Sequence, residues 1–249
     1  MKAFKTLVFG VALLAAGCSY DSGRTGVLTG SHSSAHPGAG GRTSAESGFV
    51  SLFDGQTLNG WTFVGKAGEG YHVRNGAIVT EHGVHGNLLT EKEYGDFDLR
   101  FEFLLAEPGA NNGIGIRAPL AGDIAYSGIE LQILEESGAE KKYGKLRPEQ
   151  FHGSVYDCIA AKRGALKPVG QWNTQRVVAR GRHIEVTVNG QEILKADLNS
   201  VTDVPKLQKH PGLLRERGHI GFLGHDDHVE FRNIRIREFA PPPSVENTP

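Results

Sequence analysis

One stretch of the sequence, residues 95–136, constrains the fold most because it carries three consecutive segments of alternating polarity. In 97–105, 113–117 and 129–133, apolar residues occupy nearly every second position. Successive side chains of a β-strand point to opposite faces of the sheet. Each segment is therefore predicted to be a strand with one apolar and one polar face.

The polar positions of the last two segments suggest a binding surface. They carry Arg117, Glu130 and Gln132, while Gly113 and Gly115 leave bare backbone between them. A cation, a carboxylate and an amide beside exposed backbone suit a groove that hydrogen-bonds a polar ligand. An ordinary solvated sheet face is the alternative, because antiparallel sheets commonly keep one face in water.

The rest of the chain also predicts short strands joined by tight turns. Asn75-Gly76 and Asn189-Gly190 are strong signals for two-residue turns, and the 34 glycines favour strands and turns over long helices. Further strands are expected at 71–74, 77–81, 87–90, 153–157, 174–179, 183–189, 192–196, 219–223 and 229–238, the last with a bulge between Phe231 and Ile234. Segments 135–151 and 199–217 are predicted to be irregular surface loops, the second with one helical turn. We therefore expect an all-β domain of two packed antiparallel sheets.

The N-terminus has the pattern of a secretory signal. Lys2 and Lys5 precede an apolar run at 7–16, which is too short to span a membrane. The following LAAGC sequence, residues 14–18, resembles a bacterial lipobox, in which Cys18 becomes the lipidated first residue. A plain signal peptide with an incidental cysteine is the alternative. If Cys18 is acylated, Cys158 is left without a disulfide partner.

Composition divides the chain into four parts. Residues 1–18 are the predicted signal peptide, and 19–47 are predicted to be a flexible tether because they contain almost no large apolar side chain. Residues 48–239 form the predicted β-sandwich domain, and 240–249 a disordered tail. We expect an exported protein, lipid-anchored to a bacterial membrane, in the periplasm or at the cell surface.

Charge and motifs exclude several function classes. The chain has 27 basic and 28 acidic residues with no basic stripe, so nucleic acid is not an expected partner. Nucleophile-elbow and phosphate-loop signatures are absent from the sequence, which argues against serine-hydrolase and nucleotide chemistry.

Several blocks together resemble the 3-keto-disaccharide hydrolase family, formerly a domain of unknown function. They are FDGQTLNGW (53–61), LLTEKEYGDFDLRFEF (88–103), NNGIGIR (111–117), GIELQIL (128–134), the run 153–173, and VEFRNIRIRE (229–238). The resemblance extends over residues 48–239. It implies a jelly-roll sandwich of the concanavalin A-like kind found in lectins and glucanases, and activity on oxidised glycosides in exported bacterial proteins.

The chemistry implied by this resemblance differs from that of a common glycosidase. A ketone at carbon 3 acidifies the hydrogen on carbon 2, so that elimination can expel the group on carbon 1 and water can then add. Such an enzyme needs a base, a donor to the enolate oxygen and an acid for the leaving group. It does not need a nucleophile–acid carboxylate pair. The E-x-D-x-x-E motif of related glucanases is absent, and the corresponding strand offers Glu130 and Gln132.

Three residues are the candidate catalytic groups. Glu130 is expected to be the base or a hydroxyl acceptor, with a surface carboxylate paired to Arg117 as the alternative. Arg117 is expected to hold the enolate oxygen or a sugar hydroxyl through its guanidinium fork. His152 is a candidate acid or base because it titrates near neutrality, although a histidine at a strand start is often structural.

Five further residues are candidate substrate contacts: Asn112, Gln132, Tyr156, Trp172 and His225. Asn112 and Gln132 would bind hydroxyls, unless they serve turn or edge chemistry. Trp172 would stack on a pyranose face, and a core tryptophan is the alternative.

The run His225-Asp226-Asp227-His228 contains metal-ligating residue types. Four adjacent residues on a tight turn cannot all face one ion, so a polar loop is the favoured interpretation. We expect no metal or other cofactor, and a divalent ion stays an open alternative.

Two functions compete. The first is an enzyme that cleaves 3-keto-glycosides by carbon-2 proton abstraction, elimination and hydration, acting as a monomer on a small carbohydrate. The second is a non-catalytic carbohydrate-binding surface lipoprotein. Aromatic residues make up only 8% of the chain, which favours the enzyme because sugar-binding modules need aromatic platforms. A purely structural lipoprotein leaves the polar groove unexplained.

Overall fold

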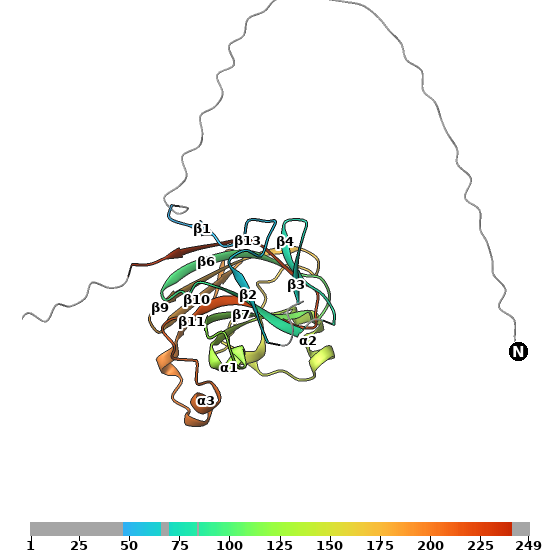
Figure 1. The fold of residues 1–249 in the computed structure, drawn as a ribbon. Coiled ribbons are helices and arrows are strands. Elements are labelled where there is room, and N and C mark those ends of the chain that lie inside the picture. Colours follow the sequence, from blue (N-terminus) through green and yellow to red (C-terminus); the bar gives the residue numbers. More distant parts are fainter. Residues whose placement is uncertain (1–46, 66–69, 84, 241–249) are drawn as a thin grey trace, which may run out of the picture. The chain divides into compact units, whose positions relative to one another are not determined.

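Two antiparallel sheets packed face to face form the domain in the computed structural model, which describes residues 47–65, 70–83 and 85–240 (Figure 1). The larger sheet has the order β11-β10-β9-β6-β13-β4-β3, with β1 also paired to β13. Its strands are β1 (Val50–Ser51), β3 (Tyr71–Arg74), β4 (Ala77–Thr80), β6 (Phe97–Leu105), β9 (Trp172–Arg180), β10 (His183–Val188), β11 (Gln191–Asp197) and β13 (Val229–Glu238). The smaller sheet has the order β2-β5-β12-β7-β8. Its strands are β2 (Trp61–Val64), β5 (His85–Thr90), β7 (Asn111–Ala118), β8 (Ile129–Leu134) and β12 (His219–His225).

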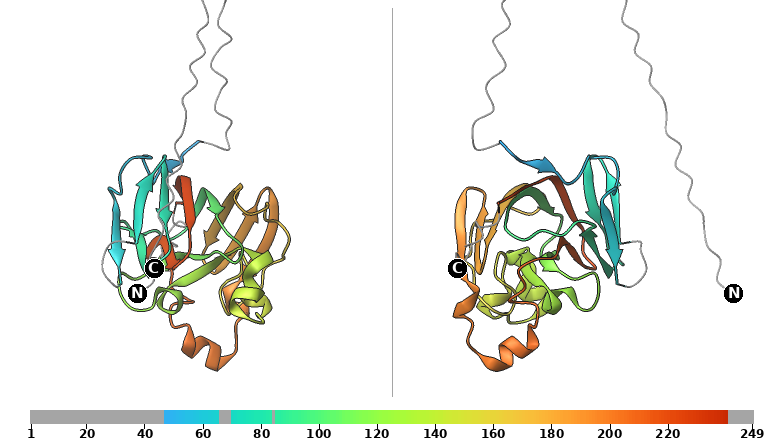
Figure 2. Two further views of the ribbon diagram at one scale, coloured as in Figure 1. Left: turned by 90° about the vertical axis from the view of Figure 1, so that its right-hand side faces the viewer. Right: turned by 60° about the vertical axis from the view of Figure 1, so that its left-hand side comes forward.

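Helices are few and short in the described part of the chain. They are α1 (Ile124–Ser127), α2 (Glu136–Tyr143) and α3 (Val204–Lys209), with 3-10 turns at Pro148–Gln150 and Leu198–Ser200. In both views of Figure 2, the orange segment that contains α3 projects away from the sheets. Among the described helices, none has the length and apolarity to cross a membrane. The predicted signal peptide, Cys18, nearly all of the tether and the C-terminal tail lie outside the described residues.

The core lies between the two sheets, as the alternating pattern predicts. β6 contributes Phe97, Leu99, Phe101 and Phe103, and the facing sheet contributes Ile114, Ile116, Leu131, Ile133 and Phe222. Phe222 stacks against Phe231 with ring centroids 3.8 Å apart and against Trp61 at 5.5 Å. The Phe222–Phe231 contact crosses the sandwich, because Phe231 belongs to the larger sheet, whereas Phe222 and Trp61 both belong to the smaller one.

Several local predictions are confirmed. The β3–β4 hairpin turns through Asn75 at φ 52° and Gly76 at φ 77°, the left-handed pair that a two-residue hairpin turn requires. The β13 register shifts between Arg232 and Arg235, and Asn233 has φ 52°, so the expected bulge is present. Cys158 is buried and free among the described residues, whereas Cys18, on whose acylation the prediction for Cys158 depends, lies outside them.

Two predictions of local structure are wrong. Segment 153–157 is not a strand; Val155 forms only isolated bridges to Leu131 and Ile159. Residues 136–143 are not irregular but form α2. The side chain of Glu135 begins this helix by accepting hydrogen bonds from the backbone N–H groups of Ser137 and Gly138.

Candidate functional site

The outer face of the five-stranded sheet holds the candidate site. On β7 and β8 the core residues are Ile114, Ile116, Leu131 and Ile133. The alternate positions, Gly113 and Gly115 on β7 and Glu130 and Gln132 on β8, therefore face away from the core. Gly113 pairs with Gln132 and Gly115 with Glu130 across the two strands. Two polar side chains on β8 thus stand beside two positions of β7 that carry no side chain.

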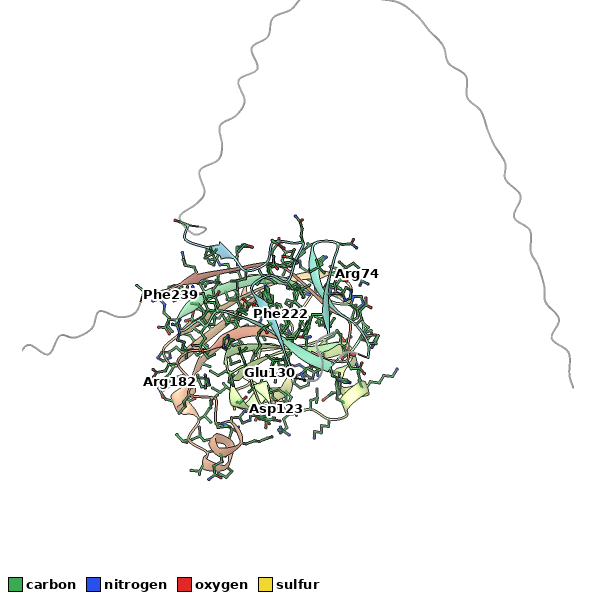
Figure 3. All side chains as sticks on the ribbon, in the orientation of Figure 1. Arg74, Asp123, Glu130, Arg182, Phe222 and Phe239 are labelled. Carbon is green, nitrogen blue, oxygen red and sulfur yellow. The ribbon has the colours of Figure 1, made fainter. Side chains whose placement is uncertain are left out.

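Gly113 determines the course of the Glu130 side chain. Glu130 leaves β8 and its carboxylate lies over β7, where a Cβ at position 113 would overlap Oε1 and lie 2.9 Å from Cδ. The carboxylate ends beside β12, with Oε1 3.6 Å from Nε2 of His225. Figure 3 labels Glu130 among the side chains of the domain. Three adjacent strands therefore supply the carboxylate, the space it occupies and the neighbouring imidazole.

The two groups of this pair differ in exposure and in partners. The side chain of Glu130 is only 2% exposed, and its Oε1 accepts no hydrogen bond from any described residue. His225 is half-exposed. Burial opposes its positive charge, but the Glu130 carboxylate outweighs this and raises the pKa of His225. The arrangement places a buried oxygen with a free lone pair beside a proton-carrying ring that solvent can reach.

Two segments lie beside this pair. Ile124 of α1 packs over Gly115, since a Cβ there would lie 3.1 Å from its Cγ2. On the other side, the backbone N–H of Tyr156 donates to the carbonyl oxygen of Glu130 at 2.9 Å. The phenol oxygen of Tyr156 accepts from Nε2 of Gln150 at 3.4 Å, which leaves its own proton available to a ligand.

The two predicted amide contacts are largely occupied within the protein. Asn112 is fully buried and faces the core, where Nδ2 donates to the hydroxyl of Tyr71 at 3.3 Å. Gln132 faces outward but is 4% exposed, and its Nε2 donates to the carbonyl oxygen of Gln150 at 3.4 Å. The prediction that Asn112 binds a sugar hydroxyl is therefore corrected: this residue supports the strand from beneath.

Arg117 has a structural position that sequence reasoning did not foresee. Its side chain is fully buried, and the guanidinium donates to the carbonyl oxygens of Gly95 (3.2 Å), Gly181 (2.6 Å) and Arg215 (3.1 Å) and to Asp96 Oδ1 (3.0 Å). With these partners it ties loops together and is not available to an enolate oxygen or to Glu130.

His152 lies in the core and not in the site. It stacks on Phe103 with centroids 5.2 Å apart, and its Nδ1 accepts from the backbone N–H of Leu134 at 3.3 Å. Burial lowers its pKa to about 3, against a weaker opposing effect of Gln175. A ring that stays neutral at physiological pH and faces the core does not fit the predicted acid or base, so the structural alternative holds.

Trp172 lies on the other sheet. It is opposite Leu104 of β6, on the outer face of the larger sheet, and the guanidinium of Arg232 covers its ring at 3.8 Å. It therefore does not stack on a sugar bound at Glu130, and it is not a core residue either.

The four residues of the β12–β13 turn diverge. Only His225 faces Glu130. Asp226 Oδ1 accepts from the backbone N–H of Gly83, Asp227 is buried, and His228 contacts Glu230 at 2.9 Å. The four side chains therefore have different partners and do not converge on one point.

Two residues near the site were not predicted from the sequence. Asp123 begins α1 by accepting from the backbone N–H of Ala125 at 3.2 Å, and its charge contributes to the raised pKa of His225. Tyr126 of the same helix packs against His210, with centroids 4.9 Å apart. A four-residue helix has no periodic signal, so only the Asp cap residue marked it in the sequence.

Comparison with known proteins gives a consistent result. A family model described as the 3-keto-alpha-glucoside-1,2-lyase-like domain matches residues 48–237. A 3-keto-disaccharide hydrolase of Bacteroides thetaiotaomicron is 28% identical in an alignment of 228 positions that covers 76% of this chain and 78% of that protein.

Solved structures share the fold. A Parabacteroides distasonis protein assigned as a glycosyl hydrolase has a TM-score of 0.66 at 25% identity, over 77% of this chain and 99% of that one. A Bacillus subtilis protein with a galectin-like fold has a TM-score of 0.52 at 13% identity, over 73% and 90% of the two chains. The predicted concanavalin A-like sandwich is confirmed. Because the family model spans most of the chain, this protein belongs to the family of 3-keto-alpha-glucoside-1,2-lyase-like domains.

Proposed function

We propose that this chain is a glycoside-cleaving enzyme that acts on 3-keto-glycosides by removing the carbon-2 proton, eliminating the aglycone and adding water. Family membership and the name of the Bacteroides relative support the substrate class. The observation that carries the proposal is the carboxylate of Glu130, which is buried over Gly113 and has an oxygen without a hydrogen-bond donor.

Glu130 is the proposed base. A sugar bound beside the Glu130–His225 pair would present its ring to Oε1, which accepts no hydrogen bond from the described residues. The ketone at carbon 3 acidifies the carbon-2 hydrogen, so a carboxylate suffices when it is positioned and desolvated. Proton transfer to Glu130 leaves an enolate, whose oxygen needs a donor. Tyr156, whose backbone N–H donates to the carbonyl oxygen of Glu130, is the proposed donor through its phenol proton.

His225 is the proposed proton partner. As the C1–O bond breaks, the imidazolium gives its proton to the leaving oxygen, and a C1=C2 double bond forms. In the second half, neutral His225 takes a proton from the water that attacks carbon 1, and protonated Glu130 returns its proton to carbon 2. Both residues finish as they began, and the net reaction is hydrolysis. The 3.6 Å separation between Nε2 and Oε1 suits two groups that act on neighbouring atoms of one ring.

The test uses a 3-keto-glucoside with a chromogenic aglycone, with the unoxidised glucoside alongside. We expect release from the keto substrate only, and a Glu130→Gln variant slower by about 10²- to 10⁴-fold. Glu185→Gln is the matched control, because this carboxylate lies on the other sheet, where its side chain is 35% exposed and pairs with Lys195 at 3.5 Å. Activity of Glu130→Gln within about threefold of wild type would assign the base elsewhere.

The competing function is a carbohydrate-binding module. It predicts no release from either glucoside, while calorimetry detects binding of the keto sugar that Glu130→Gln weakens. Release of the chromogenic aglycone by the wild-type protein contradicts this alternative.

We also propose, from the sequence alone, that the protein is an exported monomer anchored through Cys18. Labelled palmitate should enter the wild-type chain and not Cys18→Ser, and the variant should leave the membrane fraction. Sedimentation of the detergent-solubilised protein tests the monomer. Labelling that persists in Cys18→Ser contradicts the anchor.

A further inference from the structure

A second cluster of polar side chains lies at the β12–β13 turn, apart from Glu130. His82 follows β4, Glu107 follows β6, and Asp227 belongs to the turn itself. One nitrogen or oxygen atom from each of the three side chains lies within 4.8 Å of the others. Neither the predicted site nor the proposed reaction uses these residues.

The orientation of His82 places an acceptor oxygen beside each of its two ring nitrogens. Its Nδ1 lies 3.0 Å from the carbonyl oxygen of Asp226, which only accepts, so Nδ1 carries the proton. In the neutral ring Nε2 then carries the lone pair. Yet Nε2 lies 3.1 Å from Oε1 and 3.2 Å from Oε2 of Glu107, which are acceptors as well. Acceptors that face one another at this distance call for a positive charge between them.

Asp227 adds a buried carboxylate to this arrangement. Its Oδ2 accepts from the backbone N–H of Asn111 and from the hydroxyl of Tyr143, both at 2.9 Å. Its Oδ1 contacts the ammonium of Lys142, in the last turn of α2. The Lys142 side chain is 39% exposed, whereas that of Asp227 is 1% exposed. The carboxylate is therefore fixed, and the cation on it sits on a flexible stem that another cation can displace.

We propose that His82 Nε2, a carboxylate oxygen of Glu107 and Oδ1 of Asp227 bind one divalent transition-metal ion, with water completing the coordination. An imidazole with two carboxylates suits Zn²⁺ or Mn²⁺, whereas Mg²⁺ and Ca²⁺ prefer oxygen ligands throughout. The carbonyl of Asp226 plays the part of the oxygen that commonly orients a metal-bound histidine through its other nitrogen.

Such an ion would join three loops at one end of the sandwich. Asp227 is two residues from His225, and its N–H donor Asn111 is two residues from Gly113. The ion would therefore hold the turn that carries the proposed proton partner of Glu130. This role concerns position only, and the binding site does not depend on the proposed reaction.

The test is metal binding by the purified full chain without a histidine tag. A His32→Ala, His36→Ala reference removes the two tether histidines that would bind metal nonspecifically. After chelator treatment, equilibrium dialysis against Zn²⁺ and against Mn²⁺ should give one bound ion per chain for at least one of these metals. His82→Gln and Glu107→Gln should each weaken binding more than about 100-fold. Lys142→Met should tighten it, because the competing ammonium is gone.

His72→Gln is the matched control, since His72 is also an exposed histidine, with its Nε2 3.8 Å from Glu81. It should bind as the reference does. Thermal unfolding provides a second readout: an ion at about 100 times its Kd should raise Tm by about 5 to 10 °C in the reference and in His72→Gln, but not in His82→Gln. Equal affinity in the reference and His82→Gln, or no binding of either metal, would overturn the proposal. The His82–Glu107 contact would then be an ion pair of a protonated ring.

Discussion

The outer face of each sheet carries one buried carboxylate, and the two carboxylates differ in their hydrogen-bond partners. On the larger sheet, Asp98 is fully buried and Arg176 binds both of its oxygens at 3.0 Å, with Arg100 and Arg237 also in contact. On the smaller sheet, Glu130 is nearly as buried, yet its Oε1 accepts no hydrogen bond from the described residues and lies 3.6 Å from Nε2 of His225. Burial alone therefore does not identify a functional carboxylate. The two carboxylates differ instead in their hydrogen-bond donors, which Asp98 has and Oε1 of Glu130 lacks among the described residues.

The difference follows from the neighbours on each face. Around Asp98 the adjacent strands present arginines, whose planar forks match a carboxylate. Around Glu130 the adjacent strand presents Gly113, which offers space and no donor side chain. The first arrangement stabilises the fold, while the second leaves an oxygen for a ligand.

The largest expected effect comes from removing the partnered carboxylate. Asp98→Asn should lower the free energy of unfolding by about 3 kcal/mol, because three arginines lose the charge they surround. This expected loss is at the low end of the range for breaking a buried ion pair, because the three arginines are partly exposed to solvent. Glu130→Gln should change the free energy of unfolding by less than about 1 kcal/mol. Urea unfolding measures both values. An equal decrease in the free energy of unfolding in Glu130→Gln and Asp98→Asn would contradict the distinction between the two carboxylates.

The second effect concerns the space under Glu130. Gly113→Ala should reduce turnover of the keto substrate about 100-fold, equivalent to about 2.7 kcal/mol, because the new Cβ would overlap Oε1 and expel the carboxylate from its position. Gly95→Ala is the control, since a Cβ there makes no contact closer than 3.5 Å. Full activity in Gly113→Ala would contradict the proposed geometry.

The strands around this site could be predicted because alternation is a local property. Residues 97–105 and 129–133 read as strands without knowledge of their partners, and β6 and β8 are where the pattern puts them. The assignment of strands to sheets could not be predicted in this way. β6 and β7 follow one another in sequence but belong to different sheets, because pairing depends on distant segments.

The misplaced site residues have specific causes. Arg117 has φ 48° beside a register shift between β7 and β12, and a bulge of this kind breaks the alternation that predicted its direction. Asn112 lies two positions before Ile114, so the alternation itself places it on the core face. Trp172 and His152 depend on ring contacts with Arg232 and Phe103, which no local pattern encodes.

The third prediction concerns His152, a buried polar residue that lies between the two sheets and not on the outer face of either. The pKa of His152 is lowered from 6.5 to about 3. Below pH 6.5 His152 is protonated in the unfolded chain but stays neutral in the folded chain. The free energy of unfolding should therefore decrease as the pH is lowered, by up to about 1.4 kcal/mol per pH unit, until about pH 3. The His152→Gln variant should lose this pH-dependent part of the free energy of unfolding. The His72→Gln variant should keep it, because His72 is exposed. Unfolding curves between pH 4 and 7 measure the slopes, and equal slopes in wild type and His152→Gln would contradict the lowered pKa.

The smallest effect returns to the larger sheet, where not every ion pair resembles that of Asp98. Lys195 and Glu185 lie 3.5 Å apart with side chains 72% and 35% exposed. Solvent screens this pair, so Lys195→Gln should change the free energy of unfolding by less than about 0.5 kcal/mol, and the change should disappear in about 1 M salt. Arg176→Gln, which removes a bidentate partner of the buried Asp98, should cost more and keep most of that cost in salt. Equal effects of the two substitutions would mean that hydrogen-bond geometry does not distinguish the structural carboxylate Asp98 from the exposed pair of Glu185. The contrast between Asp98 and Glu130 would then depend only on the missing hydrogen-bond donor of Glu130.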